Sequence, residues 1–183
     1  MQLVSFSSLC RANTHVTGEL EHHGFWDEHL DGITVWLVPF SFRCFGWQWY
    51  GSSGDICISR VSLARVGAHV LRRPRLPLRD VLRHEWAHAI ADTHRGLFRS
   101  RQFSAVFDGS HERTTASTSY DPCEHVSQYA ATMPSEDFAE TFALWVRHAG
   151  QLPARFRCSD GVARKWKFID ELAEVIWMGA RRW

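Results

Sequence analysis

The order of apolar and polar residues changes character along the chain. Before residue 76, the stretch at residues 32–40 (GITVWLVPF) is β-branched and aromatic, which predicts a strand. The stretch that begins at Asp55 alternates imperfectly and predicts a second strand, around residues 55–61, near a sheet edge. The Gly/Ser run at residues 51–54 predicts the turn that precedes it.

After residue 76 the apolar residues recur at helical spacing. A first helix is expected from Leu78, with Pro77 at its first position and Gly96 as its stop. A second starts near Pro134 and runs to Gly150. A third, over residues 161–180, carries apolar side chains on one face: Val162, Trp166, Ile169, Leu172, Ala173 and Ile176.

The succession of strands and then helices predicts an α+β fold, with a small mixed sheet packed on the first helix and a mainly helical C-terminal half. The length of 183 residues suits one domain. We expect a sheet-rich part at 1–76, the first helix at 77–95, an irregular loop segment rich in Ser and Thr at 97–124, and a helical part at 134–180.

Composition and charge narrow the classes of protein. The chain is 45% hydrophobic and 22% charged, enough for a substantial core, and its net charge of +1 favours neither nucleic acid nor membrane as a partner. One locally basic run is expected to be a solvated face, with a phosphate- or acid-binding patch as the alternative. It comprises Arg65, Arg72, Arg73, Arg75, Arg79 and Arg83.

The five cysteines are odd in number and form no CxxC pair, so we expect buried or unpaired thiols, with one or two bridges left open. They are Cys10, Cys44, Cys57, Cys123 and Cys158. The N-terminal stretch has no signal-peptide pattern, and no apolar run approaches about 18 residues. These observations predict a cytoplasmic protein, with export without a signal as the alternative, and they leave the oligomeric state open.

The stretch HEWAH, residues 84–88, carries the candidate chemistry. His84 and His88 are four apart, so a helix places both imidazoles on one face, where two nitrogens can reach one Zn²⁺. Glu85 is rotated by about 100° from His84. It therefore points beside a metal, where it can act as a general base.

Two residues compete to be the third protein ligand of a catalytic zinc site. His94 completes the spacing H-x3-H-x5-H, but the metzincin motif requires Gly where this chain has Ala91, because the chain must turn there. Glu136 lies in the predicted second helix with Glu140 four residues later. Glu136 can bind zinc through its carboxylate, and Glu140 can accept the outer N–H of a ligand histidine.

HEWAH followed after a long gap by SQYAATMPSEDFAETFALWV resembles the glutamate-zincin peptidases, in particular a zinc-binding metallopeptidase group with a Pro-x-Glu-Asp-aromatic-Ala-Glu signature. Lethal-factor-type and Pro-Pro endopeptidases are more distantly similar. The clear match covers residues 80–95 and 125–148. The resemblance implies a zincin-like fold and the following roles: zinc ligands His84, His88 and Glu136, general base Glu85, oxyanion donor Tyr129, and Glu140 behind a ligand histidine.

These observations predict a zinc metallopeptidase that acts on a protein or peptide and binds it as an extended strand along the edge at residues 55–61. The alternatives are a zinc-stabilised peptide-binding module without activity and a metzincin-like peptidase that uses His94. A second metal site at His22, His23 and His29 is conceivable, but solvated loop histidines are expected.

Overall fold

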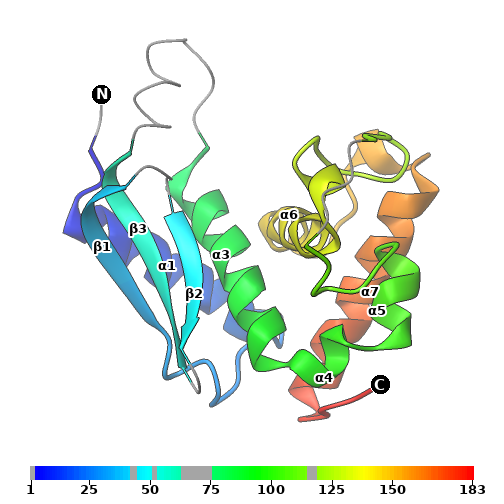
Figure 1. Cartoon of the computed structure of the whole chain (residues 1–183), viewed down its shortest axis with the longest axis horizontal. Coiled ribbons are helices and arrows are strands. Elements are labelled where there is room, and N and C mark those ends of the chain that lie inside the picture. Colours follow the sequence, from blue (N-terminus) through cyan, green and yellow to red (C-terminus); the bar gives the residue numbers. More distant parts are fainter. Residues whose placement is uncertain (1–2, 42–44, 51–52, 63–75, 115–118) are drawn as a thin grey trace.

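The computed structural model describes residues 3–41, 45–50, 53–62, 76–114 and 119–183 (Figure 1). A small sheet and helix α1 (Phe6–His22) form one side of the molecule, and helices α6 (Pro134–Arg147) and α7 (Asp160–Trp177) form the other. Helix α3 (Leu78–Thr93) lies between the two sides. The α+β prediction with a small mixed sheet is confirmed.

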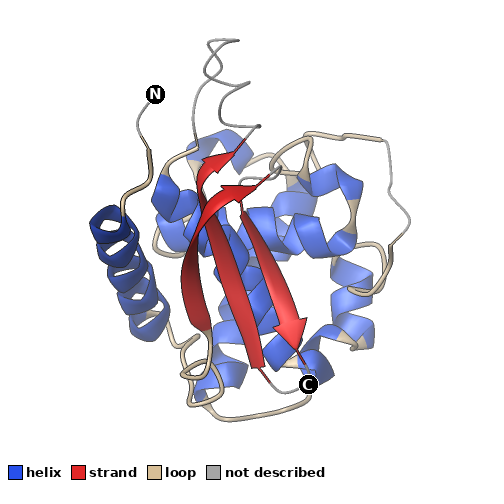
Figure 2. Ribbon diagram, turned by 60° about the vertical axis from the view of Figure 1, so that its left-hand side comes forward, coloured by secondary structure: helices blue, strands red, loops and turns tan. Residues whose placement is uncertain are grey.

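The sheet has three strands, β1 (Thr34–Ser41), β2 (Phe45–Tyr50) and β3 (Ser53–Ser62), in the spatial order β1-β3-β2. β3 runs parallel to β1 and antiparallel to β2. Figure 2 shows helices behind one face of the sheet, and Ile56 and Ile58 of β3 are fully buried. The predicted turn at 51–54 is partly wrong, because Ser53 and Gly54 belong to β3, while residues 51–52 lie outside the described part.

The prediction that residues 55–61 form an edge strand is wrong, because β3 is the central strand. An alternating pattern reports that one face of a strand is buried, and this holds for central and edge strands alike. The edge next to α3 belongs instead to β2. There the Trp47 indole donates a hydrogen bond of 2.7 Å to Asp92 of α3.

Helix α1 was not anticipated within the sheet-rich part at 1–76. Ser5 and Ser8 form a capping box at its start, and the side chains that it buries are spaced three and four residues apart: Leu9, Ala12, Val16 and Leu20. It is fastened to α3 by Arg83, whose guanidinium makes two hydrogen bonds to Glu19, of 2.6 and 2.9 Å. This contact joins α3 to α1.

The prediction that residues 97–124 are mostly loop is wrong in its first part. The structure has α4 (Arg95–Phe98) and α5 (Arg101–Val106), each too short to produce a readable period. Gly96 is inside α4, where a Cβ would collide with the carbonyl oxygen of Arg181, so it does not end α3. The aromatic rings of this segment are buried against those of α6 and α7: Phe98, Phe103, Phe107, Phe138 and Phe168.

The later helices follow their predictions closely. α3 begins at Leu78, one residue after Pro77, and α6 begins at Pro134 and ends three residues before Gly150, which has a positive φ of 76°. The apolar face of α7 is buried as expected at Val162, Trp166, Ile169, Leu172 and Ile176. The described part of the chain also has two short 3₁₀ turns, at Ala130–Thr132 and Ala154–Phe156.

Three remaining expectations concern surface and composition. In the described residues, no helix is long and apolar enough to span a bilayer. Cys10, Cys57, Cys123 and Cys158 are free thiols, whereas Cys44 lies outside the described part. Within the basic run, Arg83 is paired with Glu19 and Asp80, and Arg79 contacts His15. The other four arginines of the run lie outside the described residues.

Candidate metal centre

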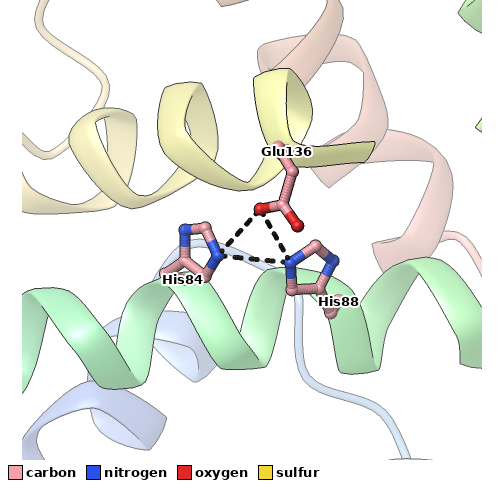
Figure 3. A group of neighbouring side chains, drawn as sticks. All are labelled: His84, His88 and Glu136. Atoms are coloured by element: carbon pink, nitrogen blue, oxygen red, sulfur yellow. Dashed lines mark hydrogen bonds and ion pairs between the residues drawn. The ribbon is translucent and has the colours of Figure 1, made fainter. Parts of the chain in front are cut away.

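Helices α3 and α6 bring two histidines and a glutamate together (Figure 3). The Nε2 atoms of His84 and His88 are 3.2 Å apart, and Oε2 of Glu136 lies 3.2 Å from the first and 3.5 Å from the second. In the described residues, this is the one group of His, Cys, Asp or Glu side chains whose ligand atoms all lie within 4.8 Å of one another.

The local sequence explains how the three side chains meet. One helical turn separates His84 from His88, so both rings leave α3 on the side that faces α6. Pro134 starts α6, which puts Glu136 in its first turn. Ala139, one turn further on, is fully buried, and its small side chain allows the close approach of the two helices.

The donor set fits a metal ion. Oε2 of Glu136 is buried and, among the described residues, has no hydrogen-bond partner of acceptable geometry, although both Nε2 atoms face it. A buried acceptor without a partner costs about 1–3 kcal/mol, which a shared cation would offset. Two imidazole nitrogens and one carboxylate oxygen are a common protein ligand set for catalytic Zn²⁺.

Glu140 contacts the ring nitrogen of His84 that does not face Glu136. Its Oε1 is 3.1 Å from Nδ1 of His84, and its Oε2 accepts a 2.8 Å hydrogen bond from the hydroxyl of Ser127. A carboxylate at Nδ1 fixes the ring orientation and favours the tautomer that leaves Nε2 for a metal. Ser127 was not predicted as a site residue, because a lone serine in a loop carries no signal of its own.

The carboxylates around His84 control its protonation. Burial alone would lower the pKa of His84, but the carboxylates of Glu136 and Glu140, which face its two ring nitrogens, outweigh burial and raise the pKa to about 9. Burial also works to raise the pKa of Glu136, yet the two facing imidazoles hold it below its usual range. Without a metal, the cluster therefore carries a proton on His84 at neutral pH.

Binding of Zn²⁺ at neutral pH is therefore expected to release a proton from His84, because a ligand imidazole must be neutral. Between about pH 6 and pH 9 the apparent zinc affinity should rise with pH, by up to about tenfold per unit. Isothermal titration in two buffers of different ionisation enthalpy measures the proton release directly. A zinc affinity that does not change with pH over this range would contradict the raised pKa of His84.

Glu85 lies on the same helix but points toward β2. It is 3% exposed, and its carboxylate accepts a hydrogen bond from the backbone N–H of Trp47. Burial, more than the opposing charges of His84 and His88, sets its pKa above the ordinary value of a glutamate. A raised pKa brings a carboxylate closer to the working range of a general base at neutral pH.

Tyr129 precedes the 3₁₀ turn before α6, and its ring lies against that of His84, with centroids 5.9 Å apart. Partial burial first, and then the neighbouring Glu136 carboxylate, raise the pKa of the phenol above its usual range. The hydroxyl therefore keeps its proton at neutral pH and can donate a hydrogen bond.

The structure does not bring His94 to this cluster. His94 follows the last residue of α3, and its Nε2 lies 3.4 Å from Asp27, whose carboxylate also contacts His29 at 3.1 Å. His22 and His23 stack edge-on at the end of α1, apart from His29, so the three do not form a joint site.

One further histidine lies near the centre, and no spacing in the sequence signals it. His111 packs its ring against Phe98 and Phe103. Burial first, and then the charge of His88, lower the pKa of His111 to about 4. His111 is thus a neutral neighbour of the cluster and not a member of it.

Comparisons with known proteins identify no relative: no protein-family model, no curated protein and no solved structure matches this chain.

Proposed function

We propose that this protein is a zinc-dependent peptidase of the glutamate-zincin type, with His84, His88 and Glu136 as the metal ligands. The observation that carries the proposal is the convergence of the His/His/Glu cluster with a buried carboxylate, Glu85, next to one of its histidines on the same helix. A structural metal site needs no such carboxylate, whereas hydrolysis requires a base beside the metal.

Zn²⁺, when bound, supplies Lewis-acid polarisation of a carbonyl and lowers the pKa of a water molecule. Glu85 would take the proton from the attacking water and later pass it to the leaving amine. Its hydrogen bond to the Trp47 backbone fixes the carboxylate beside β2. The Tyr129 hydroxyl would donate to the oxygen of the scissile carbonyl as negative charge develops there. Glu140 would hold His84 in its ligand orientation.

An extended peptide would bind by strand addition at the edge of β2 that does not pair with β3. β2 pairs with β3 on one side only in the described sheet, and its other side borders α3. A peptide laid along that edge would pass Trp47 and therefore Glu85, which accepts a hydrogen bond from the Trp47 backbone. This revises the expectation that residues 55–61 provide the edge.

The proposal is tested by turnover of a mixed peptide library followed by mass spectrometry. We expect cleavage by the purified protein, loss of cleavage after treatment with a zinc chelator, and recovery when Zn²⁺ is added back. A protein that binds zinc tightly but cleaves no peptide in the library would contradict the proposal.

Replacement of Tyr129 by Phe is expected to lower kcat by about 100-fold, as for the loss of one oxyanion donor, and to leave KM and zinc affinity near their parental values. The reason is that the hydroxyl would act on charge that develops only in the transition state. Tyr120→Phe is the matched control, since this exposed tyrosine packs near His125 instead of the cluster. Parental kcat in Tyr129→Phe would remove the residue from the mechanism.

A further inference from the structure

Lys165 of α7 is a buried cation with partners on two segments that carry the candidate metal centre. Its side chain is 1% exposed, and its ammonium lies 2.7 Å from Oδ2 of Asp137. It also donates a 2.5 Å hydrogen bond to the carbonyl oxygen of Glu124 and lies 5.9 Å from the centre of the Phe107 ring. Burial of an ammonium costs several kcal/mol unless its partners compensate, and an apolar side chain of similar size would fill the same space.

The first partner, Asp137, is the residue after Glu136 in the chain. The start of α6 has no side-chain cap, because Met133 is its N-cap residue. Without such a cap, the first turn of a helix is prone to fray. The ion pair with Lys165 holds Asp137, and hence the turn that presents Glu136, against α7.

The second partner, Glu124, begins the segment that leads to Ser127 and Tyr129. Lys165 bonds the main-chain carbonyl of Glu124. The Glu124 carboxylate lies 3.0 Å from Arg164 and packs on Gly161, where a Cβ would collide with it. Three residues later, Ser127 donates its hydroxyl to Glu140. This segment is therefore docked on the first turns of α7 before it reaches the centre.

We infer that Lys165 is a positioning residue for the metal centre, which it stabilises by joining the Glu136 turn and the Ser127–Tyr129 segment through one buried ammonium. The inference rests on the proposed function, since it assigns this role toward the zinc ligands. Metal ligands need placement within about 0.5 Å, and outer residues that secure it typically change metal affinity by about 10–100-fold.

The test compares two double variants that each remove one ion pair from α7. Lys165→Met with Asp137→Asn removes the buried pair without leaving an unpaired buried charge. Lys167→Met with Glu171→Gln removes the exposed pair on the same helix, whose atoms are 3.5 Å apart. Zinc dissociation constants are measured by competition with a chromophoric chelator, and folding by thermal unfolding.

We expect the first variant to fold with a melting temperature near that of the parent and to bind zinc about 10–100-fold more weakly. The zinc dissociation constant of the control should stay within about twofold of that of the parent. Parental zinc affinity in the folded first variant would overturn the inference. If that variant does not fold, Lys165→Arg, which keeps the charge but moves its donors, is expected to weaken zinc binding by about tenfold, and parental affinity there is the overturning result.

Amide hydrogen exchange in the metal-free proteins separates this inference from the proposed function. Loss of the buried pair should accelerate exchange in residues 125–138 more than in α7, whereas the control should change neither. If the parent binds no zinc, the proposed function fails and the exchange comparison still decides the inference: unchanged exchange in residues 125–138 overturns it.

Discussion

Replacement of Glu85 by Gln is expected to lower the rate of peptide hydrolysis by about 10²–10⁴-fold while zinc stays bound. Gln has nearly the same size and shape but cannot take a proton from water. The ligands are untouched, because Glu85 is not part of the His84, His88 and Glu136 cluster. The measurement pairs the initial rate on a cleaved library peptide with the zinc content of the same sample.

Glu21→Gln is the control for this experiment, because Glu21 is an exposed residue of α1. Its rate and zinc content should equal those of the parent. Parental hydrolysis by Glu85→Gln would refute the general-base role. If the parent itself binds zinc and peptides but never cleaves them, the protein is the zinc-stabilised binding module that the sequence also allows.

The second large effect is expected at Glu136. Glu136→Gln should weaken zinc binding by more than about 100-fold, beyond the range of about 10–100-fold typical of residues behind a ligand. The change removes the negative charge that faces both imidazoles at 3.2 and 3.5 Å. Hydrolysis should be lost together with the metal. Competition with a chromophoric chelator measures the affinity.

Two companion variants make the result specific. Glu140→Gln should weaken zinc binding by about 10–100-fold, because Glu140 contacts His84 and not the metal position. His94→Gln should bind zinc as the parent does, since His94 lies at the C-terminal end of α3 and faces Asp27. Loss of zinc from His94→Gln, with Glu136→Gln unaffected, would favour the metzincin-like alternative.

The residues of the candidate site could be predicted from the sequence, because residue spacing shows which side chains share one face of a helix. Spacing alone puts His84 and His88 on one side of α3, and Pro134 fixes the start of α6 and hence the place of Glu136 in its first turn. The choice of Glu136 over His94, and with it the pairing of α3 with α6, came from the resemblance, since no local pattern encodes which helices pack together. The structure brings these residues together as that expectation requires.

Other features depend on contacts between distant segments and were missed for that reason. The place of β3 at the centre of the sheet depends on which strands pair, and its alternating pattern is the same in either position. The sequence places Lys165 among the polar residues of an amphipathic helix, and only the folded structure shows its contacts with Asp137 and Glu124. Helix α1 is different, because the spacing of Leu9, Val16 and Leu20 was visible in the sequence.

The most direct test of the zinc-peptidase account is a crystal structure of the zinc-loaded protein, with the metal located by anomalous scattering at the zinc edge. The account predicts one Zn²⁺ bound by Nε2 of His84 and His88 at about 2.0–2.1 Å and by a Glu136 carboxylate oxygen at about 2.0–2.2 Å. It also predicts Glu85 beside the metal and outside its ligand set. A zinc ion more than about 4 Å from Glu136, or one bound by Glu85, would contradict it.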